Sequence, residues 1–382
     1  MYSLWGISID TEWVIFGLFI FLAIIQFFYL AYFFARFAFY KKKQADKQLV
    51  EHPVSVVICA KNEYHNLEKN LPLILDQNYS NYEVVVVNDC SNDDSDLLLK
   101  SFEKKYSKLK IVHLRENVNF FSGKKLALSV GIKSASNEIV LLTDADCKPS
   151  GKDWITNMQK HFDNGTEIVL GYSGYNKEPG FLNMLIRFDT VSIAMQYFGY
   201  ALAGLPYMGV GRNMAYKKSL FYKAKGFTSH YRVKSGDDDI FINQTATNKN
   251  TKIEIAKSSH TYSNPKKSFT KWFLQKKRHM TSGKYYKKRH KFLLGLFSVS
   301  QFLFFVSFIA LAIILEAHLF VLIAGATVIL RWAFLLLLYY SACRKLNELK
   351  LFLYSPIFEI IFLLLNPIFI ISNLIFKGNK WK

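Results

Sequence analysis

Long apolar segments at the two ends of the 382-residue chain constrain its fold more than any other feature. Residues 14–40 are apolar except for Gln26 and Arg36, and at about 1.5 Å per residue they can cross roughly 30 Å of hydrocarbon. A cleaved signal peptide would carry a basic start, a shorter apolar core and a small-residue cleavage site, so we predict a permanent anchor instead. The sequence therefore predicts a membrane protein.

Three further apolar segments lie in the C-terminal part of the chain. Residues 292–315 and 319–340 are long enough to be transmembrane helices joined by a tight hairpin. Residues 349–376 are also apolar but contain Pro356 and Pro367, so this segment either crosses the membrane or re-enters and lies along its inner face. The lysines that follow the last segment favour the second arrangement, because positive charge is retained on the cytoplasmic side.

Two ionisable residues, Arg331 and Glu359, fall within these apolar segments. A charged side chain at membrane depth is costly unless it faces protein or water. We therefore expect Arg331 and Glu359 to pair with each other.

The distribution of charge predicts the orientation of the chain. Residues 1–13 contain acids but no Lys or Arg, whereas four lysines follow the first apolar segment within residues 41–47. By the positive-inside rule residues 1–13 are extracytoplasmic, residues 41–52 form a basic cytoplasmic linker and residues 291–382 form a C-terminal membrane domain. The expected location is the cell (inner) membrane, crossed several times.

The chain is basic overall, with a formal charge of +20 from 49 Lys and Arg against 29 Asp and Glu. Much of this charge flanks apolar segments, and residues 266–291 interleave Lys and Arg with aromatic residues, a pattern typical of contact with an anionic membrane surface. No nucleic-acid recognition motif accompanies the charge, so we expect no nucleic-acid partner. The four cysteines form no CxxC pair, which indicates a reducing compartment and buried structural thiols.

Between the membrane segments, residues 53–290 alternate strands and helices. This alternation predicts right-handed crossovers and an α/β domain with a mainly parallel sheet. The expected strands and helices are, in turn, 53–59, 83–88, 110–114 and 138–143, and 66–75, 93–106 and 123–134.

Polar clusters follow these strands at the sheet edge where parallel strands end. Asp144 and Asp146 come directly after a buried strand and could hold Mg²⁺ or Mn²⁺, although a surface turn would have the same composition. Glu63 and Asp89 follow two other strands, and Lys124 opens a helix whose free N–H groups attract phosphate. Because ligands of open α/β sheets bind at this edge, the clusters predict a site for a cation and a phosphate.

Seven motifs follow one another along the chain. They are VSVVICAKNE, VVVVNDCSNDDS, GKKLAL, TDADC, GRNMAY, SGDDDIF and QKKRH. In this order they resemble the family 2 glycosyltransferases, whose nucleotide-sugar-binding fold is called GT-A, and the resemblance covers roughly residues 53–290. Membrane-embedded members such as the hyaluronan and cellulose synthases carry motifs similar to the last two of the series.

The resemblance implies a role for each donor-side residue. Glu63 and Asp89 would contact the nucleoside, and Lys124 would lie on the nucleotide side. Asp144 and Asp146 would be the DxD pair that holds a divalent metal on the diphosphate, with Asp144 also contacting the substrate.

The resemblance also assigns the acceptor side. Asp238 would be the catalytic base, with Asp239 as the alternative, because three consecutive aspartates leave the register open by one; the run could also be the solvated start of a helix. Gln275 and Arg278 would be the Gln and Arg of the QxxRW motif. His279 replaces its Trp, which argues against processive polymerisation.

Together these features predict an inverting glycosyltransferase at the cytoplasmic membrane face. It would move a sugar from a UDP- or GDP-sugar, with Mg²⁺ or Mn²⁺, to a lipid-linked or saccharide acceptor. The alternatives are a processive polysaccharide synthase and a non-catalytic nucleotide-sugar-binding scaffold. The apolar residues 181–207 are either a buried helix or an interfacial helix with acceptor contacts.

Overall fold

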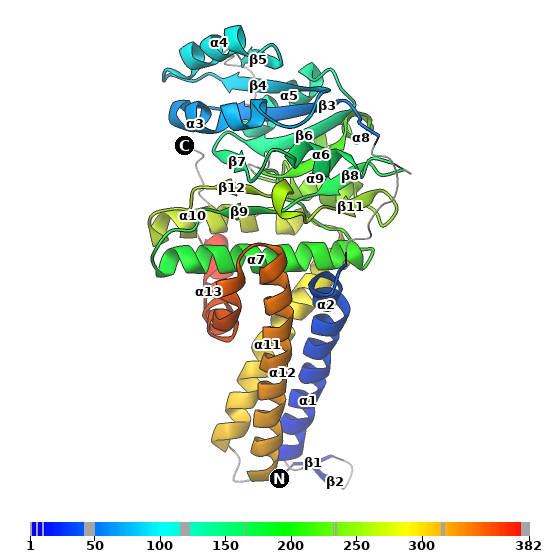
Figure 1. Ribbon diagram of the computed structural model, residues 1–382. Helices are drawn as coiled ribbons and strands as arrows, with labels where there is room; N and C mark the ends of the chain where they lie inside the picture. The colour runs from blue at the N-terminus through cyan, green and yellow to red at the C-terminus, as the bar shows by residue number, and fades with distance from the viewer. Residues whose placement is uncertain are drawn as a thin grey trace.

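The computed structural model describes residues 2–4, 7–9, 11–41, 50–114, 123–163, 165–231, 233, 235–314 and 318–375. It has an α/β part and a helical stalk, with the long helix α7 lying across the junction between them (Figure 1). Short elements outside these two parts and at loop positions are β1 (Tyr2–Leu4), β2 (Ile7–Ile9), η2 (Thr228–His230), η3 (Lys257–Ser259) and η4 (Gly283–Tyr285).

A seven-stranded sheet in the order β11-β8-β10-β6-β3-β4-β5 forms the centre of the α/β part. The four expected strands are confirmed, and they pair in parallel, whereas β10 runs antiparallel to both β6 and β8. The sheet is therefore mainly parallel, as predicted. Its strands are β3 (Val54–Ala60), β4 (Tyr82–Asp89), β5 (Leu109–Leu114), β6 (Ile139–Asp144), β8 (Ile168–Leu170), β10 (Met214–Lys217) and β11 (Thr251–Ile253).

Helices cover both faces of the sheet because its strands are apolar on both faces. Val56 and Val84 belong to one buried cluster, and their chain neighbours Val57 and Val85 to another. On the second face α5 packs so closely that a Cβ at Gly131 would lie 2.6 Å from Val57 Cγ1. The helices are α3 (Tyr64–Leu75), α4 (Ser95–Lys105), α5 (Lys124–Ser134), α6 (Trp154–Gln159), α8 (Lys218–Lys223) and α9 (Asp239–Thr245).

A three-stranded sheet and two helices close the α/β part toward the stalk. The strands pair in the order β7-β12-β9, and α7 (Phe181–Leu202) and α10 (Phe269–Met280) lie beneath them (Figure 1). Gly199 of α7 lies directly against the Phe33 carbonyl oxygen, where a Cβ would not fit. Helix α7 is thus seated on the first of the long apolar helices. The strands are β7 (Cys147–Pro149), β9 (Ser173–Tyr175) and β12 (Thr261–Ser263).

Four helical segments of the described residues are long and apolar enough to cross a membrane. Figure 1 shows three of them, which contain α1, α11 and α12, running side by side as the stalk. Helix α13 lies beside α7 and α10 and does not run parallel to the stalk helices. The segments consist of α1 (Thr11–Tyr29) with η1 (Leu30–Phe34) and α2 (Ala35–Ala38), α11 (Lys288–Ile314), α12 (His318–Lys345), and η5 (Leu349–Tyr354) with α13 (Ser355–Ile375).

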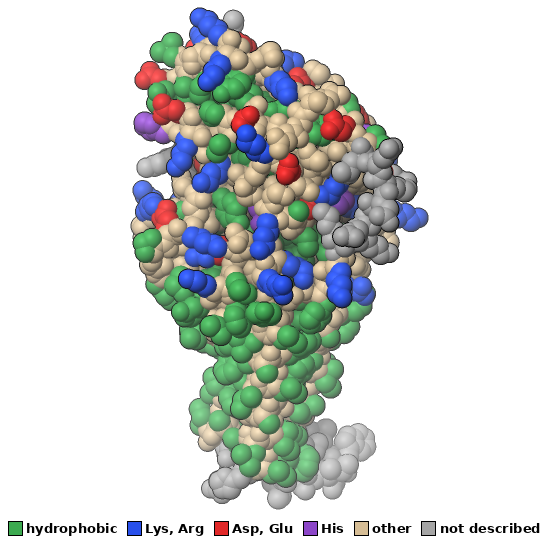
Figure 2. Space-filling view, viewed as in Figure 1, with side chains coloured by type: hydrophobic (Ala, Val, Ile, Leu, Met, Phe, Trp, Pro, Cys, Tyr) green, Lys and Arg blue, Asp and Glu red, His purple; other side chains and the backbone are tan. Residues whose placement is uncertain are grey.

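The surface of the stalk matches this composition. Figure 2 shows apolar side chains over the exposed face of the stalk, with Lys and Arg side chains gathered in a band just above it. Apolar side chains that point outward would face hydrocarbon, and a basic band suits anionic lipid headgroups. Residues 315–317, between α11 and α12, are not among the described residues. The predicted hairpin at 316–318 therefore lies largely outside them.

The expected pairing of Arg331 and Glu359 is confirmed. Two guanidinium nitrogens donate to the two carboxylate oxygens at 2.9 and 2.6 Å, and the Arg331 side chain is fully buried. Gln301 and Trp332 also donate to Glu359, at 2.7 and 3.0 Å, and Arg331 donates to Gln26 at 2.8 Å. The network joins helices α1, α11, α12 and α13.

Candidate active site

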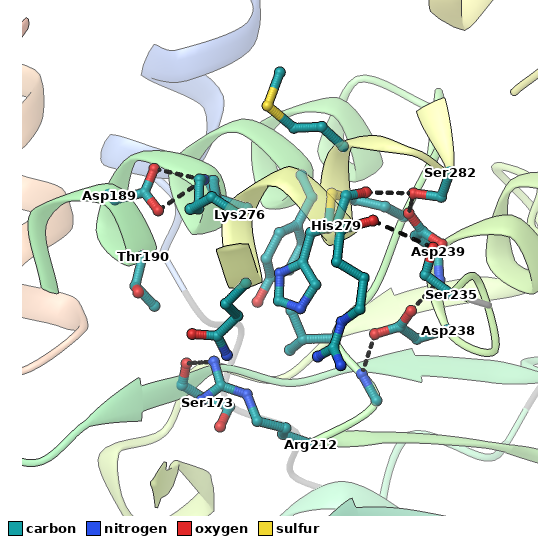
Figure 3. Close-up of a pocket in the computed structure, with 18 of the residues that line it drawn as sticks. Ser173, Asp189, Thr190, Arg212, Ser235, Asp238, Asp239, Lys276, His279 and Ser282 are labelled. Atoms are coloured by element: carbon teal, nitrogen blue, oxygen red, sulfur yellow. Dashed lines mark hydrogen bonds and ion pairs between the residues drawn. The ribbon is translucent and has the colours of Figure 1, made fainter. Parts of the chain in front are cut away.

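A cavity of about 590 Å³ opens between the carboxyl ends of the central strands and the two helices α7 and α10. Its lining includes Asp144 and Asp146 at the sheet edge, and Leu294 and Ser298 of the long apolar helix α11. Figure 3 shows labelled residues from the sheet, from α7 and from α10 around this space. The cavity therefore extends from the polar sheet edge to the start of the helical stalk.

The turn after β6 presents Asp144 and Asp146 to the cavity. Ser263 Oγ donates to Asp146 Oδ2 at 2.8 Å, and Asn70 Nδ2 donates to the Ala145 carbonyl at 3.1 Å. The turn is thus fixed from two sides, and both carboxylates lie at the same edge of the sheet.

Lys124, the first residue of α5, lies between two acidic segments. Its Nζ is 2.8 Å from Asp144 Oδ1 and 3.3 Å from Asp237 Oδ2. Burial alone would lower the pKa of Lys124, but the carboxylates of Asp144, Asp237 and Asp238 outweigh it and hold the pKa well above its usual value. Lys124 is therefore a fixed positive charge beside the DAD turn.

Lys125, the next residue of α5, does not share this role. Its Nζ donates to the carbonyls of His230 and Val233 at 2.8 and 2.7 Å. Burial lowers its pKa to about 8. Lys125 instead holds the loop that precedes the three aspartates.

The three consecutive aspartates point to different partners. Asp237 accepts from Lys124, whereas Asp239 accepts from Ser282 Oγ and from Tyr286 Oη, the latter at 2.7 Å. Asp238 caps α9 and accepts only backbone N–H bonds in the described residues, from Gly211 at 2.9 Å and Asp239 at 2.8 Å. The carboxylate of Asp238 is thus the one of the three with no side-chain donor there.

Burial and the neighbouring carboxylates change the acidity of this group. Burial is the larger cause, and the charges of Asp237 and Asp239 add to it, so that the pKa of Asp238 rises to about 7. The pKa of Asp237 is lowered, because Lys124 and backbone hydrogen bonds outweigh its burial. A carboxylate with a pKa near neutrality in a cleft is suited to accepting a proton.

Helix α10 brings Gln275, Arg278 and His279 to the cavity wall. Gln275 Nε2 lies 3.5 Å from Tyr175 Oη, at the limit of a hydrogen bond. The His279 side chain faces the cavity, whose walls shield it from bulk water. This desolvation, together with the charges of Arg278 and Lys276, lowers the pKa of His279 to about 3. His279 is therefore a neutral ring at neutral pH, at the position where the motif expects Trp.

Asp89 ends β4, and Glu63 follows β3 at the start of α3; both lie on the same edge of the sheet as Asp144 but outside the lining of the cavity. Asn66 Nδ2 donates to Glu63 Oε2 at 2.5 Å. Burial, followed by the charges of Asp146 and Asp144, raises the pKa of Glu63 despite this bond. Both residues occupy the part of the edge on the far side of Asp144 from β10.

The donor set fits a divalent cation held jointly with a substrate. Among the described residues no group of three or more His, Cys, Asp or Glu side chains could hold a metal ion. Two carboxylates, Asp144 and Asp146, are the hard oxygen ligands that Mg²⁺ or Mn²⁺ takes when phosphate oxygens complete its shell. The residues present fit that arrangement rather than a closed protein cage.

Sequence reasoning did not assign a role to Arg212 of the GRNMAY motif, which also lines the cavity. Its guanidinium lies 4.5 Å over the Tyr175 ring, and Nη2 donates to the Ser173 carbonyl at 3.3 Å. The motif was visible in the sequence, but nothing there showed that the side chain lies in the cavity. Figure 3 shows Arg212 and Asp238 around the same space.

Comparisons with known proteins agree with this architecture. Residues 55–231 match the model of glycosyl transferase family 2. A putative teichuronic acid biosynthesis glycosyltransferase TuaG of Bacillus subtilis is 30% identical over 25% of this chain and 36% of its own length. A poly-beta-1,6-N-acetyl-D-glucosamine synthase of Staphylococcus epidermidis is 32% identical over 28% of this chain and 27% of its own. The chain spans about a third of the length of the first curated relatives that it matches.

A solved structure resembles almost the whole chain. It is a mannosyltransferase from Pyrobaculum calidifontis in complex with GDP-Man and Mn²⁺, with a TM-score of 0.57 and 19% identity, covering 92% of this chain and 99% of the other. At 19% identity, the similarity between the two proteins shows a shared fold and nothing more. Residues 55–231 are thus similar to glycosyl transferase family 2, and the mainly parallel sheet together with the solved structure shows that the chain has the GT-A fold.

Proposed function

We propose that the protein is an inverting glycosyltransferase that moves a sugar from a nucleotide-sugar donor to an acceptor hydroxyl at the membrane surface. The observation that carries this proposal is the position of Asp238. Its carboxylate lines a cavity that has Lys124 and the DAD turn at one end and membrane helix α11 at the other. A base so placed lies between a site for a diphosphate and a route from the membrane.

On the donor side, Glu63 and Asp89 contact the nucleoside of a UDP- or GDP-sugar in this proposal, and Lys124 lies beside its diphosphate. Asp144 and Asp146 hold Mg²⁺ or Mn²⁺, which when bound neutralises the charge of the leaving diphosphate. The mannosyltransferase of similar fold was solved with GDP-Man and Mn²⁺, which favours a nucleotide-sugar donor and a divalent metal here. Gln275 and Arg278 complete the wall on the side of α10.

On the acceptor side, Asp238 takes the proton of the attacking hydroxyl. A pKa of about 7 lets the carboxylate accept that proton at neutral pH and release it afterwards. The hydroxyl oxygen then bonds to the anomeric carbon as the bond to the nucleoside diphosphate breaks. One displacement on one face inverts the configuration, and the chain needs no carboxylate nucleophile for it.

The membrane arrangement that we propose keeps residues 53–290 on the cytoplasmic face of the cell membrane. Residues 14–40, 292–315 and 319–340 cross it, and residues 349–376 lie at its inner surface. The position of α13 supports the last assignment, because Phe369 lies 4.8 Å from Phe273 of α10 and Asn373 Nδ2 donates to the Lys277 carbonyl at 3.0 Å. A lipid-linked or saccharide acceptor would reach Asp238 from that surface.

The test is release of nucleoside diphosphate by the detergent-purified full chain. It is given a panel of UDP- and GDP-sugars and a membrane lipid extract, with Mn²⁺ or with EDTA. Release that depends on metal and on one donor is expected, with a product that carries a single added sugar. Metal-dependent nucleotide binding without donor consumption would replace the proposal with the scaffold function, and a long polymer would indicate a processive synthase.

A further inference from the structure

Two arginines are buried among the residues that the structure describes, and both have a carboxylate partner. Arg187 Nε donates to both oxygens of Glu348 at 3.2 and 3.1 Å, and Arg331 makes the two-bond pair with Glu359. Arg212 makes no ion pair with any Asp or Glu among the residues that the structure describes. Burial alone would lower the pKa of Arg212, but Tyr175, Cys147, Asp146 and Asp144 raise it, so carboxylate charge lies nearby although no carboxylate pairs directly with the guanidinium. A partly buried guanidinium without a direct partner can bind an anion.

Arg212 is held rigidly in place. Its carbonyl oxygen accepts from Thr143 Oγ1 at 3.1 Å and from Thr261 Oγ1 at 3.0 Å. The guanidinium lies over the Tyr175 ring, and Nη2 donates a long hydrogen bond to the Ser173 carbonyl. The buried Nη1 has no hydrogen-bond partner in the described part of the chain. Arg212 therefore holds a fixed planar cation in the wall of the cavity, and the described residues do not use all of its hydrogen-bond donors.

The order of the strands places Arg212 away from the nucleoside side. β6, which ends at Asp144, lies between β3 and β10 in the sheet. Glu63 and Asp89 follow β3 and β4 on one side of Asp144, whereas Arg212 precedes β10 on the other. An anion at Arg212 would thus lie beyond the DAD turn, on the side where the cavity continues toward α7 and α11.

The far end of the cavity identifies the kind of molecule that carries this anion. The wall formed by α7 and α11 includes the apolar Ile193, Ala194 and Leu294, together with polar side chains of the same helices such as Thr190 and Ser298. Lipid phosphates lie at the membrane surface, with their chains in the hydrocarbon beyond it. A molecule that fills this end is apolar on the membrane side and anionic at the sheet edge.

We propose that Arg212 binds the phosphate group of a lipid acceptor and so places the acceptor hydroxyl beside Asp238. The backbone N–H of Gly211, the residue before Arg212, donates to Asp238 at 2.9 Å. An anion bound by Arg212 would therefore lie close to the Asp238 carboxylate. The inference rests on the proposed transferase function and adds the chemical class of the acceptor. A guanidinium presents two parallel N–H donors to phosphate, which a lysine cannot do.

The experiment uses the full chain in detergent and a membrane lipid extract separated by anion exchange into neutral and anionic fractions. Sugar transfer to each fraction is measured with the donor that the enzyme consumes, and donor hydrolysis is measured without lipid. We expect wild type to label the anionic fraction alone. Arg212→Gln should lower that transfer by about 30-fold or more, while hydrolysis stays within about 2-fold, because water carries no phosphate.

Two further variants make the result specific. Arg212→Lys should restore part of the transfer, since it keeps the charge but not the paired donors. Lys271→Gln removes an exposed cation of α10 that does not line the cavity, and it should transfer as wild type does.

Equal labelling of the neutral fraction by wild type would overturn the inference, and this arm decides the matter even where Arg212→Gln does not fold. A raised KM for the donor in the hydrolysis assay of Arg212→Gln would also overturn it, because the anion would then belong to the donor. Absence of both hydrolysis and transfer in wild type, with every donor, would instead overturn the transferase function on which the inference rests.

Discussion

Two clusters of buried charge lie at opposite levels of the molecule, and they differ in how completely their groups are paired. In the membrane helices, Arg331, Glu359 and Gln26 donate to or accept from one another, and Trp332 and Gln301 bind the remaining carboxylate positions. In the cavity, Asp238 accepts only backbone N–H groups and Arg212 has an unused Nη1 within the described residues.

The difference separates structural charge from chemical charge. In the first cluster the guanidinium and the carboxylate neutralise each other, although Arg331 Nε has no hydrogen-bond partner among the described residues, and the network fixes the helices that contribute to it. In the cavity cluster, charged groups lack a direct partner, and a bound substrate can supply the opposite charge or the proton that they need. The comparison predicts that the membrane cluster controls stability and that the cavity cluster controls turnover.

The largest effect is expected from Asp238→Asn. Loss of the proton acceptor should lower transfer by about 10³-fold or more, which corresponds to about 4 kcal/mol, while the affinity for donor changes little. The measurement is nucleoside diphosphate release at saturating donor.

Asp239→Asn is the matched control for this variant. It removes the same charge from the next residue, whose carboxylate is already occupied by Ser282 and Tyr286, so we expect a loss of transfer within about 10-fold and a lower thermal stability. A larger loss of transfer in Asp239→Asn than in Asp238→Asn would assign the base to Asp239.

In the membrane cluster, Arg331→Met should lower the free energy of unfolding by about 3 kcal/mol, because it leaves the Glu359 carboxylate buried without its partner. The double variant Arg331→Met/Glu359→Met should recover much of this loss, since no buried charge remains. Thermal unfolding in detergent measures both. Losses that simply add in the double variant would show that the two side chains are not coupled.

The pH dependence of transfer provides a third comparison. Because the pKa of Asp238 is raised to about 7, this base is protonated and inactive below that pH and active above it. We expect kcat/KM to fall about tenfold for each pH unit below 7. The residual activity of Asp238→Asn should lack this slope, and a flat profile in wild type between about pH 5.5 and 8 would contradict the assignment.

The smallest effect is expected from Tyr286→Phe, which removes one of the side-chain hydrogen bonds to Asp239. Stability should fall by about 1 kcal/mol, as for an ordinary hydrogen bond, and transfer should stay within about 3-fold. A loss as large as that of Asp238→Asn would show that Asp239 is not merely structural.

Local sequence patterns predicted much of the fold. The β-branched runs gave strands β3, β4, β5 and β6 within one or two residues, because short apolar runs between turn residues have few other ways to be buried. The pairing of Arg331 with Glu359 was also predictable. Hydrocarbon leaves an ionisable side chain few partners, so two such residues in adjacent segments constrain each other.

Local sequence could not distinguish among three consecutive aspartates. Their roles depend on Lys124, which lies more than 100 residues earlier, and on Ser282 and Tyr286, which lie more than 40 residues later. The direction of Lys125 toward the carbonyls of His230 and Val233 has the same origin. Each is decided by which segment packs on the site, and residue spacing carries no record of that.

The sequence by itself thus determined the element types, the carboxyl-edge cluster at Asp144 and Asp146 and the membrane character of both ends, because periodicity, strand order and apolar length are local properties. Only the tertiary structure decided that Asp238 lines the cavity without a side-chain donor among the described residues, that Arg212 lies there without an ion pair, and that α13 packs on α10. These features depend on the residues that surround each side chain, and those residues come from segments that are distant in the sequence and meet only when the chain folds.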